Sequence, residues 1–325
     1  MEAKKNYCGI DVSAEVLDLC FQTADGSKQH LQVKNNKSGF SQMLKACTGN
    51  YHFVMEATGV YHLGLVFFLH EREQCFSVVN ALQIKRYIQM HLERNKSDRK
   101  DARRICEYGI DRNPECYEMP DSAYFECRSL NNAIEAMTKE ITKLTNQIHS
   151  LKRVPYNVQM IIKSYACLIN KLRKEKSGME QELTEKLKAW QPELLQQVQS
   201  VKGIGKRAAA ELIIYTKGFK GMKTYKQLIS YAGLSPVEYS SGSSIKGRTR
   251  ICKQGGRQLR HILYMGALNA KVTNRACREL FDRLVANGKN KKAAVIAVCN
   301  KLLKQVFGCV KNGTRFNDNY AKFLA

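Results

Sequence analysis

Short apolar runs alternate with helical patterns along the first 110 residues, and their order constrains the fold more strongly than any other feature of the chain. The strand-like runs are, in order, "YCGIDVS", "VLDLCFQTA", "KQHLQVKN", "HFVMEA" and "FSVVN". Helical patterns follow the third, fourth and fifth of these runs, near residues 39–48, 60–72 and 82–92. This order predicts an α/β domain whose sheet is covered by helices on both faces.

Two of these strands contain an acidic residue. Asp11 stands inside the first strand, in "GIDVS", and Glu56 stands at the end of the fourth, in "VMEATG". Burying an unpaired carboxylate costs several kcal/mol, so each of them needs a partner. In this strand order the first and fourth strands lie side by side, and a late helix can cross their carboxyl ends.

Two more carboxylates stand among basic residues in "RNKSDRKDARR", residues 94–104. Asp98 and Asp101 are three residues apart, which places them on one face of a helix. One interpretation is helix capping, with Ser97 or Asp98 as the N-cap and Asp101 in the first turn. The other is a cation site, in which Asp11, Glu56, Asp98 and Asp101 converge on Mg²⁺ or Mn²⁺. Such ions serve phosphodiester chemistry, and the surrounding Arg and Lys would then hold a nucleic-acid backbone.

Positive charge is concentrated in the last two fifths of the chain. The whole chain carries a net charge of +24, of which residues 1–110 contribute +3 and residues 111–190 contribute +2. Residues 191–325 hold 25 Lys and Arg against 6 Asp and Glu, a net charge of +19. Charge gathered in one segment indicates a polyanionic partner, most often nucleic acid.

The twelve cysteines do not show the spacing of a disulfide framework or a zinc site. No CxxC occurs, and the closest pairs, Cys106/Cys116 and Cys299/Cys309, are ten residues apart. We therefore expect reduced cysteines that are mostly buried in the core. The N-terminal "MEAKKNYCGIDV" does not resemble a signal sequence, and the apolar run "LGLVFFL" is shorter than a membrane span of about 18 residues. These features predict a soluble, cytoplasmic protein without a membrane partner.

The chain changes character after the α/β region. Residues 120–190 hold two amphipathic helical patterns on either side of Pro155, which predict an antiparallel hairpin or coiled coil that spaces domains or forms oligomers. From residue 191 the chain is mainly helical, apart from a Gly/Ser-rich loop at 240–247. The predicted fold class is thus α/β plus α, with domains at 1–115, 116–190 and 191–325.

A glycine-containing turn in "SVKGIGKRAAAELI" has the form of a helix-hairpin-helix. In that motif the glycines let the backbone approach a phosphate, which the amides of the next helix bind. A plain helix turn with glycines is the alternative. The candidate nucleic-acid contacts here are Lys202, Gly203, Gly205, Lys206 and Arg207.

The motifs taken together resemble one known family. "GIDVS", "MEATGVY", "VNALQIKRY" and "NKSDRKDARRI", in this order, are similar to the N-terminal RuvC-like, ribonuclease-H-fold domain of the DEDD insertion-sequence transposases. These are bridge-RNA-guided recombinases, sometimes called the IS-one-ten family. "VKGIGKRAAAELI", "YAGLSPVEYSSGSS" and "CKQGGRQLRHILYMGA" resemble the family's second half. The resemblance implies that its four acidic positions correspond to Asp11, Glu56, Asp98 and Asp101. Ser97, where the family commonly has Thr, and Gly256, where it has Asn, are departures that touch no proposed catalytic group.

The resemblance also gives a role to the loop "EYSSGSSIKGRTR", which composition alone would describe as a flexible turn. The family has a nucleophilic serine in an S-G context, and Ser241 before Gly242 fits it best, with the adjacent Ser240 left open. Basic residues near the loop would neutralise charge that develops on phosphorus and hold the backbone: Lys246, Arg248, Arg250, Lys253 and Arg257. The resemblance further implies that the carboxylates help to activate the serine in a composite site.

The resulting prediction is an RNA-guided DNA recombinase in the prokaryotic cytosol or nucleoid. Its predicted partners are donor and target double-stranded DNA, a structured non-coding guide RNA, and further copies of itself in a dimer to tetramer. A metal-dependent junction resolvase or nuclease without a covalent step is the first alternative. An ATPase or sugar kinase ranks low, because no second Gly-rich phosphate loop accompanies "GIDVSAEVLDLCF". A non-catalytic nucleic-acid-binding protein would not need the four carboxylates together.

Overall fold

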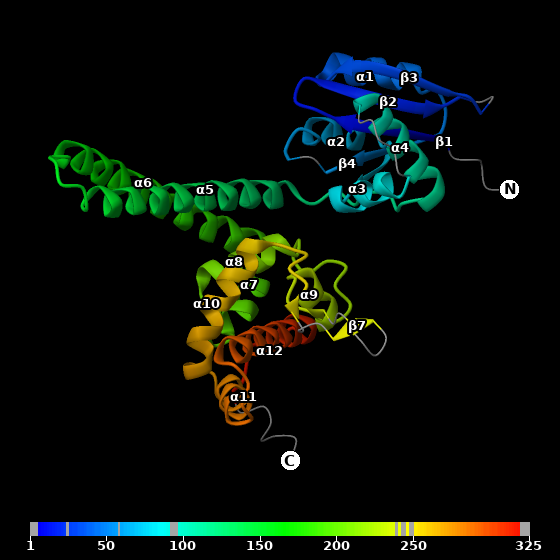
Figure 1. The fold of residues 1–325 in the computed structure, drawn as a ribbon. Coiled ribbons are helices and arrows are strands. Elements are labelled where there is room, and N and C mark those ends of the chain that lie inside the picture. Colours follow the sequence, from blue (N-terminus) through cyan, green and yellow to red (C-terminus); the bar gives the residue numbers. More distant parts are fainter. Residues whose placement is uncertain are drawn as a thin grey trace. The chain divides into compact units, whose positions relative to one another are not determined.

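The structure is a computed structural model that describes residues 6–23, 26–57, 59–91, 97–237, 240–241, 245–246 and 250–318. At residues 240, 241, 245 and 246 it describes the backbone alone. The chain divides into two compact units, residues 1–119 and residues 120–325 (Figure 1). Each unit is described by itself, and the predicted division into three domains stays a prediction.

Unit 1 is built on one five-stranded sheet. Its strands are β1 (Asn6–Val12), β2 (Val16–Gln22), β3 (Lys28–Lys34), β4 (Tyr51–Glu56) and β5 (Cys75–Val79). Their spatial order is β3-β2-β1-β4-β5, in which β1 pairs antiparallel with β2 and parallel with β4. β3 is antiparallel to β2, and β5 is parallel to β4. The predicted neighbours, the first and fourth strands, are therefore adjacent at the centre of a mixed sheet.

Helices cover both faces of this sheet, as the sequence predicts. The helices of unit 1 are α1 (Lys37–Ala46), α2 (Leu63–His70), α3 (Ala81–Met90) and α4 (Asp98–Arg112). Phe40 of α1 and Leu65 of α2 join one core, together with Ile10 of β1. Ile84 of α3 and Ile105 of α4 join a second core on the opposite face, which includes Tyr7. The alternation of Tyr7 and Ile10 between the two cores follows from the two-residue period of a strand.

Gly9 lets α4 lie directly on β1. A Cβ at this position would stand 2.1 Å from the backbone nitrogen of Cys106 and 2.4 Å from the carbonyl oxygen of Ala102. Both contacts are with helix backbone, which cannot move aside as a side chain can. The glycine in "CGIDV" therefore sets how closely the helix approaches the strand that carries Asp11.

One expectation about the cysteines is wrong. Cys75 and Cys116 form a disulfide across a Cα–Cα distance of 5.8 Å. They meet because the segment after α4 runs beside β5, where the backbone amide of Tyr117 donates to the carbonyl of Phe76 at 2.6 Å. The ten other cysteines are free, and eight of them are buried, as the sequence predicts. Spacing along the chain could not indicate a pair that is made by two different elements.

Unit 2 begins with two long helices that pack along each other, α5 (Ser122–Leu151) and α6 (Gln159–Trp190) (Figure 1). The shorter helices are α7 (Pro192–Ser200), α8 (Lys206–Tyr215), α9 (Tyr225–Tyr231), α10 (Arg257–Thr273), α11 (Arg275–Ala286) and α12 (Lys291–Asn312). Four two-residue strands lie between α9 and α10: β6 (Pro236–Val237), β7 (Ser240–Ser241), β8 (Ile245–Lys246) and β9 (Arg250–Ile251). The hairpin is present where the sequence predicts it, and its coiled-coil packing stays a prediction.

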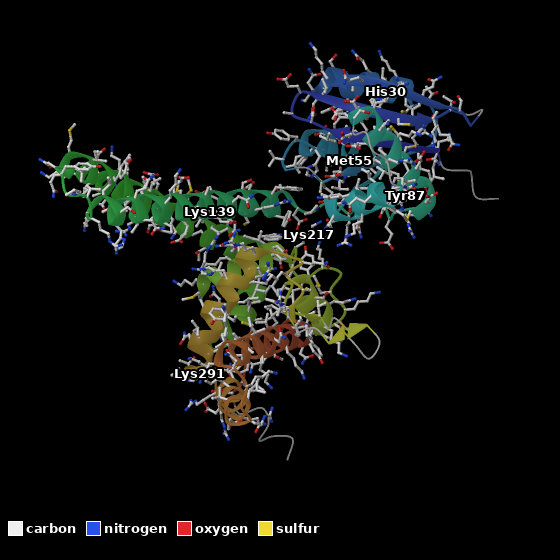
Figure 2. All side chains as sticks on the ribbon, in the orientation of Figure 1. His30, Met55, Tyr87, Lys139, Lys217 and Lys291 are labelled. Carbon is white, nitrogen blue, oxygen red and sulfur yellow. A yellow bond between two sulfur atoms is a disulfide. The ribbon has the colours of Figure 1, made fainter. Side chains whose placement is uncertain are left out.

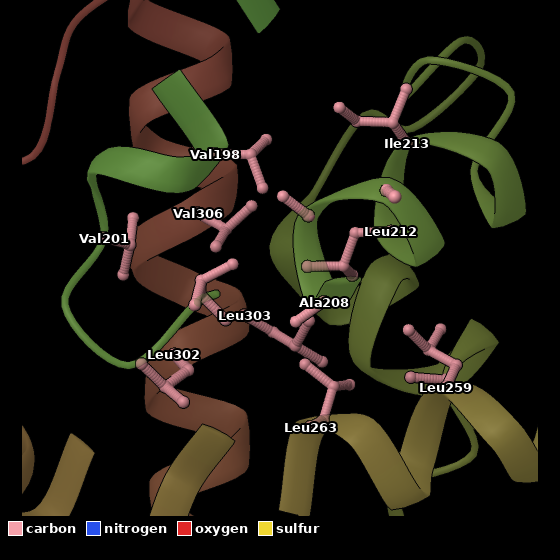
Figure 3. Packing of buried hydrophobic residues seen from close by; sticks show 14 of the residues in the cluster. Val198, Val201, Ala208, Leu212, Ile213, Leu259, Leu263, Leu302, Leu303 and Val306 are labelled. Carbon is pink, nitrogen blue, oxygen red and sulfur yellow. The ribbon is translucent and has the colours of Figure 1, made fainter. Parts of the chain in front are cut away.

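The core of unit 2 forms around α12. Leu302, Leu303 and Val306 of this helix pack with Leu212 of α8 and Leu263 of α10 (Figure 3). Among the described residues, α12 is the one helix that is long and apolar enough to cross a membrane by length and composition. Its apolar residues are accounted for by this core, and Lys291 and Lys292 at its start are exposed (Figure 2).

Candidate active site

Asp11 lies on the face of β1 that α4 covers. Residues two apart in a strand point to the same side, so Asp11 shares the face of Gly9, against which α4 packs. In β4 the partner of Ile10 is Met55, which lies inside unit 1 (Figure 2). Glu56, the next residue and the last of β4, therefore stands beside Asp11 at the carboxyl end of both strands. The sequence-predicted placement of these two carboxylates is confirmed by this strand register.

The N-terminus of α4 brings the other two carboxylates. Gly9 lies against Ala102 and Cys106, so the first turn of the helix extends past Gly9 toward Asp11. Asp98 and Asp101 are the acidic residues of that first turn. Ser97 is the N-cap, and its hydroxyl accepts from the backbone amide of Lys100 at 3.4 Å. Capping and convergence thus occur together, because Ser97 caps the helix while the aspartates face the strands.

The electrostatics of Asp11 show that the carboxylates are near one another. Burial raises the pKa of Asp11 from 3.8 to about 6, and neighbouring negative charges raise it further in the same direction. In order of decreasing effect, the neighbours are Asp101, Asp98, Glu56 and Asp18. Like charges gathered in a half-buried place disfavour ionisation unless a cation offsets them.

The donor set fits a divalent cation. Carboxylate oxygens are the ligands that Mg²⁺ and Mn²⁺ prefer, and the raised pKa of Asp11 reflects an excess of negative charge at this place. The carboxylates are more widely spaced than the ligands of a single closed site. In the described ranges, one group of three or more His, Cys, Asp or Glu has all its ligand atoms within 4.8 Å of one another, and it lies elsewhere in unit 1.

Asp18 is a fifth acidic residue at this site, which the sequence reasoning did not single out. It lies on β2 directly opposite Asp11 and is buried. Gln32 Nε2 donates to both of its carboxylate oxygens, at 3.2 and 3.1 Å, and His30 Nε2 lies 3.3 Å from Oδ1. The available signal was an acidic residue in the middle of "VLDLCFQ", the same signal that identified Asp11. Asp18 is held within the sheet by β3, which distinguishes it from the four carboxylates at the edge.

Asn35 links the two loops that leave the site, and the sequence gave no signal for it. Its side-chain amide donates to the carbonyl of Ser13 at 2.8 Å and to the carbonyl of Tyr61 at 3.1 Å. Ser13 follows β1 and Tyr61 follows β4, so one side chain joins the segments that come after Asp11 and Glu56. This crosslink restricts the relative movement of the two loops.

Ser241 lies in a short hairpin of unit 2. Its backbone pairs with Ile245, and that of Ser240 pairs with Lys246, in the antiparallel strands β7 and β8. The side chains of Ser240, Ser241 and Lys246 are outside what the structure describes, as are Gly242 and Arg248. A hairpin tip is consistent with a loop that presents its residues outward, and the role of Ser241 stays a prediction.

The glycine turn between α7 and α8 places its basic residues in different surroundings. Gly203 has a φ of +104°, and a Cβ there would stand 2.5 Å from the Cβ of Ala270, so packing against α10 requires a glycine. Gly205 caps α8 and has open space around it. Lys206 is exposed, whereas Lys202 pairs with Asp318 at 2.8 Å.

Arg207 points inward instead. Its Nη2 lies 3.5 Å from Oε2 of the buried Glu211, and its Nη1 is buried. Arg250, Lys253 and Arg257 are exposed, and Arg257 begins α10. The exposed candidates of the turn and of the start of α10 are therefore those best placed for a phosphate backbone.

Two family models match the chain. The model described as "Transposase", of the DEDD type named for IS110, matches residues 8–153, and the model "Transposase IS116/IS110/IS902 family" matches residues 195–282. The first match includes Asp11, Glu56, Asp98 and Asp101, and the second includes Ser241. A DEDD-type transposase domain indicates the use of a divalent metal.

Several curated proteins resemble the chain over most of its length. A pilin gene-inverting protein of Moraxella bovis is 27% identical over 96% of this chain and 98% of its own length. A transposase for the insertion sequence element IS1111A of Coxiella burnetii is 23% identical over 90% of this chain and 86% of its own. An IS110 element protein of Streptomyces coelicolor is 27% identical over 48% of this chain and 38% of its own.

The order of the two family matches agrees with the carboxylate site of unit 1 and with the serine hairpin of unit 2. The chain belongs to the IS110 family of transposases and is a DNA recombinase.

Proposed function

We propose that this transposase is an RNA-guided recombinase that cuts and rejoins DNA through a serine–phosphodiester link, aided by Mg²⁺ at the four carboxylates. The observation that carries the proposal is the convergence of Asp11, Glu56, Asp98 and Asp101 at one end of the sheet. Two strands and one helix supply them, and all three neighbours act on the pKa of Asp11. Four carboxylates in one half-buried place are unfavourable unless they serve a cation.

The carboxylates have a positioning role in this proposal. Asp11 and Glu56 are fixed by neighbouring strands, and Asp98 and Asp101 are fixed by the capped first turn of α4. Such fixed oxygens would hold Mg²⁺ or Mn²⁺, which when bound supplies positive charge to a reacting phosphate. The rigid sheet and helix keep the ligands in place without further reorganisation.

The hydroxyl of Ser241 supplies the nucleophile. Its Oγ forms a bond to phosphorus while the bond from phosphorus to the oxygen of the departing strand breaks. The serine loses one proton and the departing oxygen gains one, so the products are a phosphoserine link and a strand with a free hydroxyl. The energy of the broken bond is kept in the new one, so the reverse step rejoins strands without ATP.

The nucleic acids bind mainly to unit 2. Its positive charge is the feature that supports both a DNA duplex and a structured guide RNA as partners. Lys206, Arg250, Lys253 and Arg257 are its exposed candidates for backbone contact. Recombination joins two duplexes, so we propose that several copies act together and that the α5–α6 hairpin holds them.

The second candidate is a junction-resolvase-like nuclease. It is favoured by one observation, that all four carboxylates lie in unit 1, where they could serve hydrolysis without Ser241. In that case water attacks phosphorus and no protein–DNA link forms.

Replacing Asp101 by Asn tests the metal role of the carboxylates. The substrate is DNA that carries the flanks of the gene, incubated with Mg²⁺ and with RNA transcribed from those flanks. We expect strand cleavage to fall at least about 100-fold, because losing a metal ligand removes several kcal/mol of charge stabilisation. Asp282→Asn, an exposed carboxylate of α11, is the matched control and should cleave normally. Full cleavage by a folded Asp101→Asn variant would contradict the metal role.

A further inference from the structure

Three metal-binding side chains meet at the edge of the sheet of unit 1, apart from the four carboxylates. His52 lies on β4, Cys75 lies at the start of β5, and Cys116 lies in the segment after α4. One ligand atom from each lies within 4.8 Å of the other two. Imidazole and two thiols are the donor set of borderline-soft divalent ions, and not of Mg²⁺.

The strand register makes this meeting a fixed property of the fold. His52 pairs with Cys75 across the parallel strands β4 and β5, so both side chains stand on the same face. Tyr7 pairs with His52 on the other side, and its ring stacks on the imidazole at a centroid distance of 5.4 Å. His52 therefore has a packed, defined orientation and reaches toward the edge strand.

The third ligand comes from the segment that runs beside β5. The hydroxyl of Ser77 donates to the carbonyl of Glu115 at 2.5 Å, next to Cys116. The amide of Tyr117 donates to the carbonyl of Phe76. Backbone bonds on both sides of Cys116 thus hold its thiol at Cys75 without help from the disulfide.

The same serine sets the tautomer of His52. Nε2 of His52 lies 2.7 Å from Oγ of Ser77, whose single proton is directed to the carbonyl of Glu115. Oγ must then accept, and Nε2 must donate. The proton of the neutral imidazole is thereby on Nε2, which leaves the lone pair of Nδ1 for a ligand. A histidine whose other nitrogen donates to an oxygen is the usual arrangement at a metal.

Access differs among the three residues in a way that suits a site that opens on reduction. His52 is buried, Cys75 is half-buried and Cys116 is exposed. A DNA recombinase works where DNA is, in a cell interior in which thiol systems reduce exposed disulfides. One dithiol reductant transfers two electrons and two protons to the Cys75–Cys116 bond, giving two thiols and an oxidised reductant.

We infer that the reduced protein binds a borderline-soft divalent ion such as Zn²⁺ through Nδ1 of His52 and the thiolates of Cys75 and Cys116. Two thiol protons leave as the ion binds. Thiolates on one tetrahedral ion stand about 3.8 Å apart, which the broken disulfide permits within the observed grouping. Three protein ligands leave a fourth position for water beside the exposed Cys116. The ion would take over from the disulfide in fixing the last residues of unit 1 to β5.

Cobalt substitution tests this site, because a thiolate bound to Co²⁺ gives a near-ultraviolet charge-transfer band that oxygen ligands do not give. The full chain is reduced with a phosphine, kept free of air, and titrated with Co²⁺. We expect one equivalent to produce the band and tetrahedral visible bands, and Zn²⁺ to displace them. The oxidised protein should give neither. Absence of the band in the reduced protein, or the same band in the oxidised protein, would overturn the inference.

Variants identify the ligands. Cys116→Ser changes an exposed residue and should weaken Co²⁺ binding strongly, whereas Cys167→Ser, an exposed free cysteine of α6, should bind like wild type. His52→Gln should lower the affinity at least about 10-fold and weaken the tetrahedral bands. Equal binding by Cys116→Ser and Cys167→Ser would contradict the site. Asp101→Asn should keep the band, so failure of the carboxylate proposal and failure of this inference are separate results.

Discussion

Asp11 has Asp18 opposite it on β2, Glu56 beside it on β4, and Asp98 and Asp101 at the start of α4. Its pKa of about 6 lies above the ordinary 3.8 because of burial first and these negative charges second. The folded protein therefore binds a proton at Asp11 more tightly than the unfolded chain does. Without a metal ion, the stability from this proton is fully present below pH 3.8 and is lost as the pH rises through about 6.

Replacing Asp11 by Asn removes this loss. We expect the metal-free variant to be more stable than wild type at pH 8, by about 1 kcal/mol once solvent screening is allowed for. The difference should shrink as the pH falls from about 6 toward 3.8, where wild-type Asp11 is protonated. Thermal unfolding in a chelator at several pH values measures it. Asp282→Asn should show no such trend, and a destabilised Asp11→Asn at pH 8 would mean that Asp11 has a cationic partner in the protein.

At the residue scale, acidic residues in apolar strands were enough to identify Asp11 and Glu56. The same signal was present at Asp18 and was not used, because its role depends on Gln32 and His30 of the next strand. Asn35 could not be found from the sequence. Its contacts are with backbone carbonyls, which any residue at Ser13 or Tyr61 would provide.

At the scale of elements, the site depends on how α4 lies on β1. The helix is held at close range by the absence of a side chain at Gly9, and its first turn carries two of the four carboxylates. The distance between strand and helix is therefore also the distance between Asp11 and its partners. A change that lifts the helix should disturb the site without removing any of its charges.

Gly9→Ala makes that change. The new Cβ would overlap the backbone of Ala102 and Cys106, so α4 must shift. We expect a loss of about 1–3 kcal/mol in the free energy of unfolding, as for other overpacked cores, and a lower affinity for Mg²⁺. Gly178→Ala in α6 is the matched control, since nothing lies within 4 Å of its Cβ. It should be neutral or stabilising by up to about 1 kcal/mol. Chemical denaturation and metal titration compare the two, and equal stability would contradict the packing argument.

Most elements followed from local pattern. The five strands, the helices on both faces and the long hairpin are where alternation and helical spacing predict them, since those periods report which face is buried. The Cys75–Cys116 bond could not be predicted in this way. It depends on a segment without helix or strand that runs beside β5, and its path is set by bonds from Ser77 and to Phe76.

At the scale of the whole molecule, charge and chemistry fall in different units. Unit 1 holds the carboxylates, and residues 191–325 of unit 2 hold most of the net positive charge. The division of the chain at residue 119 was not apparent from sequence, because the helical patterns of α5 and α6 have no intrinsic preference for either neighbour. Their packing against α8 places them with the second unit.

The charge of unit 2 predicts how binding depends on salt. Each phosphate contact releases a counterion, so the logarithm of affinity should fall linearly with the logarithm of salt concentration, with a slope near −0.9 per contact on duplex DNA. Fluorescence anisotropy of labelled DNA over a range of salt measures the slope. Lys206→Ala and Arg257→Ala should each reduce it by about one contact. Arg207→Ala should reduce it less, because that guanidinium bonds to the buried Glu211. An affinity that does not change with salt would contradict a phosphate-binding surface.

The covalent link between Ser241 and DNA is the central claim, and trapping that link is its most direct test. DNA that carries the flanks of the gene, nicked beside the cleavage point so that a short strand is lost on cutting, is incubated with protein, Mg²⁺ and flank RNA. The products are run on a denaturing gel. Wild type should give a protein–DNA adduct that resists denaturant, and Ser241→Ala should give none while still binding DNA, because the change removes no charge. An adduct with Ser241→Ala that is absent with Ser240→Ala would place the nucleophile one residue earlier. Cleaved DNA without any adduct in wild type would contradict the recombinase mechanism and favour hydrolysis.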